Sequence, residues 1–204
     1  MKVKENSKIM NEAAASLKGK WAHAIGVCVL YSLMAILLAI IPFVSLIGVW
    51  VITPHLLVGI LIFHLNISRG KTARSNDLFS AFDSRYLTII YAQFLAAWLI
   101  VMHMFLFFIP GIIAALALSQ VFFLIADDPK LTASDAIYKS VKIMNGYKWK
   151  LFKINLRLFG LAILCIFTLG IGFFWYYPYQ CVVLAKFYDD IKNNPSFKNQ
   201  EYIN

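Results

Sequence analysis

Few residues in this sequence are of types that carry out chemistry, and they are scattered along the chain. The four histidines lie inside uncharged stretches, and the only acidic doublets are Asp127–Asp128 and Asp189–Asp190. Neither His-x-x-Glu-His nor Glu-x-x-His spacing occurs, so no cluster resembles a metal site. There is also no Gly-x-Ser-x-Gly elbow and no phosphate-binding Walker loop. The sequence therefore predicts no catalytic residue, no metal and no cofactor.

Polar side chains inside apolar stretches are functional candidates, because an ionisable group in lipid is costly. The candidates are His55, His103, Gln93 and Gln120. One interhelical hydrogen bond satisfies such a group and stabilises a membrane protein by under about 1 kcal/mol on average, so a structural role is the simpler interpretation. We interpret the acidic doublets as solvated helix ends or as partners of Lys153 and Arg157.

The element around which the chain is organised is residues 86–126, which contain no Asp, Glu, Lys or Arg. A helix rises about 1.5 Å per residue, so a hydrocarbon core of roughly 30 Å needs about 20 residues. This stretch is 41 residues long, which is too long for one span and right for two. Proline fits the first turn of a helix because it lacks the N–H that a helix interior needs. Pro110 and Gly111 therefore predict the turn of a helical hairpin.

Two other apolar stretches predict hairpins of the same kind. Residues 21–68 are uncharged, and Pro42, Ser45 and Gly48 mark the expected turn. The last stretch, 158–185, has only 28 uncharged residues. Two spans fit there if the first begins near Trp149 and its lysines reach toward the headgroups. The alternative is a single span with an exported C-terminus.

Shorter amphipathic segments precede the hairpins. Apolar residues recur at helical spacing before Gly19, and Thr132 to Asp135 form a capping signal for a helix that ends at Gly146. We therefore expect one all-α membrane domain, 1–204, with six helices in three hairpins. Its parts are an interfacial amphipathic helix (1–20), hairpin 1 (21–68), a cytoplasmic link (69–85), hairpin 2 (86–126), a cytoplasmic amphipathic helix (127–148), hairpin 3 (149–188) and a cytoplasmic tail (189–204).

The distribution of charge sets the expected orientation. The 19 Lys and Arg residues all lie outside the three predicted outer turns, so the positive-inside rule places the basic segments and both termini in the cytoplasm. The inner leaflet is anionic, and each nearby basic side chain contributes about 1 kcal/mol of attraction. We expect lipid-headgroup contacts from Lys148, Lys150, Lys153 and Arg157. Topology already accounts for the net charge of +9, so nucleic acid is not an expected partner.

Several motifs resemble those of one protein family. They are Leu17-Lys18-Gly19-Lys20-Trp21, Ser68-Arg69-Gly70-Lys71, Asp77-Leu78-Phe79-Ser80-Ala81-Phe82, Ile109-Pro110-Gly111-Ile112-Ile113, Ala136-Ile137-Tyr138-Lys139-Ser140, Asn145-Gly146-Tyr147-Lys148-Trp149, and Thr168 to Phe173 with Tyr177-Pro178-Tyr179. The chain resembles the uncharacterised bacterial membrane proteins grouped as domain of unknown function nine-seven-five, and more distantly the membrane part of glycerophosphodiester phosphodiesterases. The resemblance implies a multi-pass protein of the bacterial cytoplasmic membrane with about six spans, and it supplies no catalytic residues.

Composition favours a membrane protein, and the amphipathic helices, the density of aromatic residues and the lack of catalytic motifs favour a role that is not enzymatic. With 61% hydrophobic residues and a mean hydropathy of +0.72, the chain lies outside the range of soluble domains. We expect an accessory, scaffold or immunity-type protein that binds membrane lipids, anionic ones above all, or a membrane protein or peptide partner. A small transporter or channel is the alternative, and a lipid-acting enzyme is the third option.

Overall fold

The computed structural model describes residues 3–40, 42–82, 85–106 and 108–194, and within these ranges the chain is helical with no strand. The expected all-α class is therefore confirmed. The elements are α1 (Asn6–Leu17), α2 (Trp21–Ile40), α3 (Pro42–Ser68), the 3-10 helix η1 (Ser75–Phe82), α4 (Tyr86–Leu106), α5 (Phe108–Leu118), α6 (Val121–Asp127), α7 (Ala133–Ile143), α8 (Lys148–Phe167) and α9 (Phe173–Lys192).

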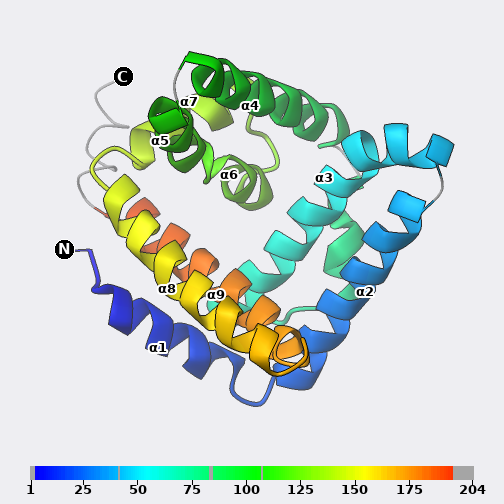
Figure 1. Cartoon of the computed structure of the whole chain (residues 1–204), viewed down its shortest axis with the longest axis vertical. Coiled ribbons are helices and arrows are strands. Elements are labelled where there is room, and N and C mark those ends of the chain that lie inside the picture. Colours follow the sequence, from blue (N-terminus) through cyan, green and yellow to red (C-terminus); the bar gives the residue numbers. More distant parts are fainter. Residues whose placement is uncertain (1–2, 41, 83–84, 107, 195–204) are drawn as a thin grey trace.

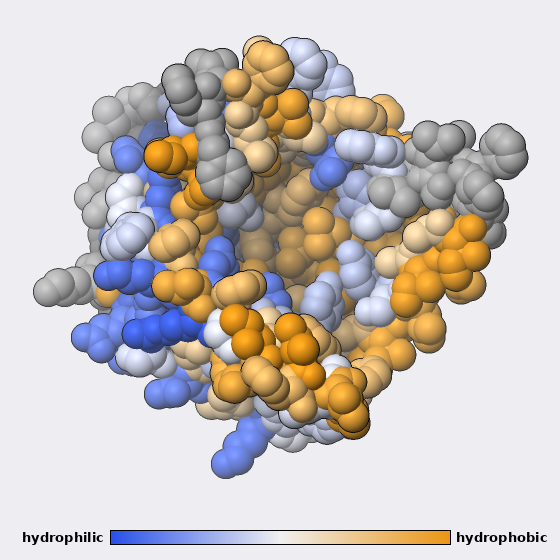
Figure 2. Space-filling model, in the orientation of Figure 1, coloured by the Kyte–Doolittle hydropathy of each residue, from blue (hydrophilic) through white to orange (hydrophobic). Residues whose placement is uncertain are grey.

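Seen down the shortest axis, the helices follow the sides of a rough square (Figure 1). α1, α8 and α9 form one side, α2 and α3 form the next, α4 lies along the third, α5 and α7 close the fourth, and α6 lies inside the square. The space-filling view shows this face hollowed in its middle, with apolar side chains on much of its rim (Figure 2). The consecutive helices α2 and α3, α4 and α5, and α8 and α9 pack against each other.

Four helical segments of the described chain are long and apolar enough to cross a membrane. They are Trp21–Ile40, Trp50–Ser68, Tyr86–Phe105 and Ile109–Asp127. α8 differs because its first half carries four basic residues, and α9 differs because its last turns hold Lys186, Asp189, Asp190 and Lys192. α8 and α9 correspond to the third predicted hairpin. They differ from the other predicted spans because charged residues lie within both helices.

The turns of the first two hairpins are tighter than the sequence suggested. α2 ends at Ile40 and α3 begins at Pro42, so Ser45 and Gly48 lie inside α3 rather than in a turn. α4 ends at Leu106 and α5 begins at Phe108, which places Pro110 in the first turn of α5, as expected. The residues between these helices, 41 and 107, lie outside the described residues.

Local signals set several other boundaries. Gly19 and Gly146 have positive φ angles of 77° and 81°, a backbone conformation that glycine adopts without a steric penalty, so α1 and α7 end where expected. Thr132 caps α7, accepting a hydrogen bond from the Asp135 N–H at 3.2 Å. The three cysteines, Cys28, Cys165 and Cys181, are free.

The second half of hairpin 2 is interrupted, which the sequence did not indicate. α5 and α6 are separated at Ser119 and Gln120, and the break is covered by α7. The buried Ser140 hydroxyl donates to the Ala117 carbonyl at 2.7 Å and accepts from the Gln120 N–H at 3.3 Å. One side chain of α7 therefore satisfies main-chain groups that the break leaves without helical partners.

The N-terminal helix packs on protein along its buried face. Ile9, Ala13 and Leu17 are fully buried in a cluster with residues of α3, α8 and α9. α1 follows α9 lengthwise, because the Lys4 N–H donates to Asp190 near the end of α9 and the Tyr179 hydroxyl donates to the Met10 carbonyl. The apolar stripe of α1 is therefore occupied by the rest of the chain.

The link between the first two hairpins folds back along α3. Asp77 accepts a hydrogen bond from the Asn66 side chain at 3.0 Å, and the Phe82 ring lies 5.1 Å from the His55 ring. Leu78, between them, is fully buried. η1 thus covers α3 from its last turn to its middle.

Candidate functional site: a charged network where α3, α6 and α9 end

The charged side chains that lie closest together gather where α3, α6 and α9 end. We define the charged network as Arg69, Asp127, Tyr188, Asp189 and Lys192. Arg69 directly follows α3, Asp127 is the last residue of α6, and the other three lie in the last turns of α9. The ends of three helices thus bring charged residues to one place.

Arg69 holds two of these helix ends together. Its Nη2 donates to Asp189 Oδ1 at 2.6 Å and its Nε donates to the same oxygen at 3.1 Å, while Nη1 donates to Asp127. The guanidinium suits this task because its donors are fixed in a planar fork. Burial disfavours the charged form of Arg69, but the hydrogen bonds and charges of Asp127 and Asp189 outweigh that effect and raise its pKa.

Asp127 is the most connected carboxylate of the charged network. Besides Arg69, it accepts hydrogen bonds from the Tyr188 hydroxyl at 3.0 Å and from the Lys192 ammonium. Its side chain is only 12% exposed. The Tyr188 ring is fully buried and stacks on Phe123, with 5.4 Å between the ring centroids. α9 is therefore bound to α6 by both packing and ion pairing.

A second set of contacts extends the charged network toward α1 and α8. Asp190 accepts hydrogen bonds from Lys150 Nζ and from the Lys4 N–H, both at 3.0 Å. Lys186 Nζ donates to the Ser68 main-chain carbonyl at the end of α3. Five helices, α1, α3, α6, α8 and α9, are thereby joined at this end of the molecule.

The ion pairs of the charged network hold helix ends together. Both carboxylates of the charged network already accept hydrogen bonds from cations, so neither is poised to take a proton from a substrate. Within the described ranges no three His, Cys, Asp or Glu side chains come close enough to hold a metal ion.

The partners of the acidic doublets differ from those expected. Asp127 and Asp189 pair with Arg69, Asp127 also pairs with Lys192, and Asp190 pairs with Lys150. In the part of the chain that the structure describes, Lys153 and Arg157 form no ion pair with either doublet. They lie on an exposed face of α8, one helical turn apart.

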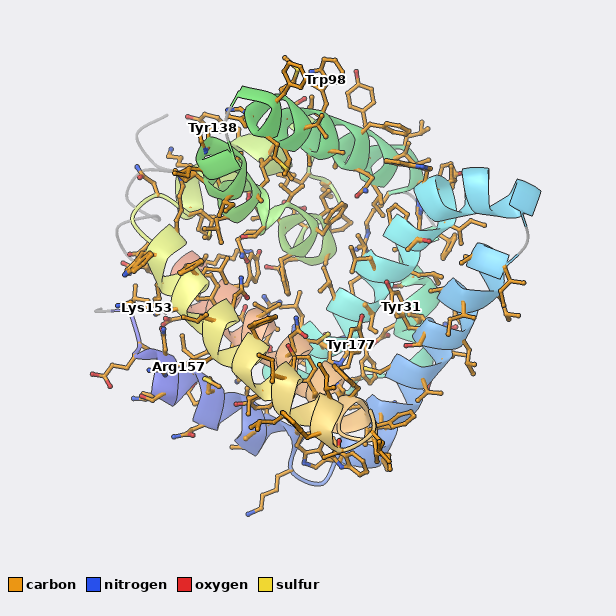
Figure 3. All side chains as sticks on the ribbon, viewed as in Figure 1. Tyr31, Trp98, Tyr138, Lys153, Arg157 and Tyr177 are labelled. Carbon is orange, nitrogen blue, oxygen red and sulfur yellow. The ribbon has the colours of Figure 1, made fainter. Side chains whose placement is uncertain are left out.

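The four basic residues selected on α8 fall into two kinds. Lys153 and Arg157 are exposed, on the edge of α8 beside α1 (Figure 3), and Lys153 Nζ lies 5.7 Å from the Trp149 ring centroid. Lys148 is half-buried at the start of the helix. Lys150 differs because its ammonium is committed to Asp190. Lys148, Lys153 and Arg157 therefore remain the better placed of the four to meet a headgroup.

The selected histidines are bonded to main-chain oxygens. His55 is fully buried, with Nδ1 beside the Val51 carbonyl and Nε2 3.2 Å from the Tyr86 carbonyl, so it joins the middle of α3 to the start of α4. His103 is exposed, and its Nδ1 lies 2.6 Å from the Leu99 carbonyl within its own helix. Neither histidine lies in the charged network.

The two selected glutamines occupy different surroundings. Gln120 is buried at the α5–α6 break, where its amide donates to the Ser119 hydroxyl at 2.9 Å. Its Oε1 has no hydrogen-bond partner among the described residues. Gln93 is half-buried on α4. The structure therefore does not bring the polar candidates together into one site.

Large apolar side chains cover much of the outer surface. Leu87, Phe105, Phe167 and Leu169 are 77–94% exposed, and Trp98 points outward from α4 (Figure 3). Two mostly apolar pockets accompany them. One, of about 400 Å³, lies between α2 and α9, where the Tyr31 and Tyr177 rings stack with 6.2 Å between centroids. The other, of about 500 Å³, lies among α1, α2, α8 and α9.

Fold and site together define an all-helical protein with four helices compatible with a membrane and a charged network at the ends of three helices. The family model described as "Protein of unknown function (DUF975)" matches residues 86–195, more than half of the chain. The chain belongs to this family. No curated protein and no solved structure matches it, and the comparisons do not show the resemblance to glycerophosphodiester phosphodiesterases.

Proposed function

We propose that this chain is a multi-pass protein of the bacterial cytoplasmic membrane that binds lipid or a membrane partner and catalyses no reaction. The observation that supports this most is the separation of its surfaces. Large apolar side chains are exposed along α2, α4 and the α8–α9 hairpin, whereas the ion pairs gather where α3, α6 and α9 end. Exposed apolar area on that scale is unfavourable in water and favourable in hydrocarbon.

In the topology that we propose, three hairpins provide six membrane segments, with both termini in the cytoplasm. The hairpins are α2 with α3, α4 with α5 and α6, and α8 with α9. The charged network then lies at the inner surface, where Arg and Lys are favoured. Lys148, Lys153 and Arg157 lie near anionic headgroups, and the apolar pockets beside α2 and α9 accept acyl chains. α8 carries its basic residues in its first three turns, so their long side chains reach the inner interface.

Membrane insertion and topology are tested separately. We expect the protein to stay in the membrane fraction after alkaline carbonate extraction, and its release would contradict membrane insertion. For topology, single cysteines replace Ile171, Lys71 or Lys139 in a variant without the native cysteines. A membrane-impermeant thiol reagent should label Ile171→Cys in intact cells, and Lys71→Cys and Lys139→Cys only after permeabilisation. Labelling of Ile171→Cys only after permeabilisation would contradict a spanning third hairpin.

A further inference from the structure

A polar pocket of about 640 Å³ lies beside the charged network, between α1 and the last turns of α3 and α9. Its volume is in the range of small-molecule sites, about 300–1,000 Å³. Four basic and three acidic side chains are among the described residues that line it. The lining residues come from three separate segments, 3–12, 68–69 and 186–194. The pocket therefore forms only when the chain is folded.

The acidic side chains of the pocket are already neutralised. Each accepts a hydrogen bond from a basic side chain, and two of those cations, Arg69 and Lys4, belong to the pocket themselves. The pairs are Arg69–Asp189, Lys150–Asp190 and Lys4–Glu12. The lining therefore offers little negative charge to a cationic ligand.

Two lysines of the pocket, Lys8 and Lys186, form no salt bridge with a carboxylate of the described chain, although Glu12 and Asp189 are near enough to attract Lys186. Lys186 donates to the Ser68 carbonyl, and an ammonium group has three donors, so two of them are left for a ligand. Lys8 is exposed on α1 and forms no ion pair with any residue that the structure describes. The unused hydrogen-bonding capacity of the two lysines is therefore cationic, and it comes from two helices that pack against each other, α1 and α9.

We propose that this pocket binds a phosphate group, held by the ammonium groups of Lys8 and Lys186. Phosphate oxygens accept several charge-assisted hydrogen bonds, and lysine provides them as a point charge that adapts to the ligand. The phosphate belongs to a phosphodiester or phosphomonoester with a small polar substituent, which the Asn193 side of the pocket accommodates. A phospholipid headgroup and a soluble phosphate ester share this chemistry. The lipid source rests on the proposed membrane location, whereas the soluble source does not.

The test compares two lysines of one helix. Lys8→Gln removes a pocket cation, and Lys18→Gln removes an exposed lysine at the end of α1 that lies outside the pocket. The full chain is purified in an uncharged detergent, and thermal unfolding is followed while glycerol phosphate or inorganic phosphate is added at constant ionic strength. In parallel, lipid retention is measured by native mass spectrometry with phosphatidylglycerol and with a neutral glycolipid that lacks phosphate.

We expect a phosphate compound to bind the unmodified protein and Lys18→Gln alike, and to bind Lys8→Gln about tenfold more weakly, since one charge-assisted contact is lost. The Lys8→Gln/Lys186→Gln variant should lose binding, and Lys8→Arg should retain it. Binding of glycerol phosphate or inorganic phosphate identifies a soluble source, and selective retention of phosphatidylglycerol alone identifies a lipid headgroup.

Equal binding by all variants, or no preference for phosphate over the glycolipid and chloride, would overturn the proposal. Membrane insertion is measured independently by carbonate extraction, so failure of the phosphate site and failure of the proposed function give different results.

Discussion

A Cβ atom placed on Gly59 would lie 2.0 Å from the main-chain oxygen of Leu78, so α3 and η1 meet there backbone against backbone. The same atom would lie 2.9 Å from Leu78 Cα. No side-chain rotation can relieve these contacts, because the opposing atoms belong to the main chain. This contact positions the link between the first two hairpins and, with it, the start of α4.

Replacing Gly59 with alanine should therefore displace η1 from α3. Forcing a methyl group into a packed site costs about 1–3 kcal/mol, and we expect a lower unfolding temperature in detergent together with faster proteolysis between Arg69 and Arg85. Gly26→Ala is the matched control, because a Cβ on Gly26 in α2 meets nothing within 4 Å. Equal stability of the two variants would show that η1 does not pack closely against α3 at Gly59.

Ser140→Ala should destabilise the chain at the α5–α6 break. The change removes the bond donated to the Ala117 carbonyl and the bond accepted from the Gln120 N–H, and it leaves both main-chain groups buried. An unsatisfied buried polar group costs about 1–3 kcal/mol. The measurement is thermal unfolding in detergent, with the exposed Ser134→Ala of the same helix as the control. A loss in Ser134→Ala as large as that in Ser140→Ala would argue against the proposed role of the hydroxyl.

Arg69→Gln should weaken the charged network, because it leaves Asp127 and Asp189 without their shared cation. The Arg69 side chain is 27% exposed, so solvent screens part of the loss, and we expect about 1–3 kcal/mol in the free energy of unfolding. Adding Asp127→Asn and Asp189→Asn to Arg69→Gln should restore part of that stability. By contrast, Glu12→Gln breaks the more exposed Lys4–Glu12 pair and should cost under about 1 kcal/mol. If the triple variant is less stable than Arg69→Gln alone, unpaired charge is not the cause.

The combined variant Lys148→Gln, Lys153→Gln and Arg157→Gln should reduce association with anionic lipid. Each basic side chain near an anionic surface contributes about 1 kcal/mol, so we expect a loss of about tenfold to a hundredfold in retention of phosphatidylglycerol. Lys150 is kept because it pairs with Asp190. The control replaces Lys18, Lys71 and Lys130 with glutamine, which changes the net charge equally. Retention that falls equally in both variants would assign the effect to net charge rather than to α8.

Signals that act over a few residues could be read from the sequence. Thr132 caps α7 three residues from its bonding partner, Gly146 ends the same helix, and Pro110 lies in the first turn of α5. Each of these signals depends on local backbone geometry alone. The all-α class could also be predicted, because it follows from the long uncharged stretches.

Features that depend on distant segments could not be predicted in the same way. Arg69 bonds to residues 58 and 120 positions away, and nothing near Asp127 or Asp189 in the sequence distinguishes Arg69 from Lys153 or Arg157 as a partner. The acidic doublets indicated that basic partners are required nearby. Which basic side chain pairs with them depends on how α3, α6 and α9 pack. Likewise, helical spacing in α1 indicated an apolar face without indicating that α9 covers it.

The packing of α1 on α9 also constrains how the protein is made. Of the described helices, α1 leaves the ribosome first and α9 last, and α9 supplies part of the surface that covers Ile9, Ala13 and Leu17. That part of the cover cannot form until translation has passed Lys192. A nascent chain that stalls before Phe173 therefore leaves the apolar face of α1 incompletely covered, and we expect quality-control proteases to remove it.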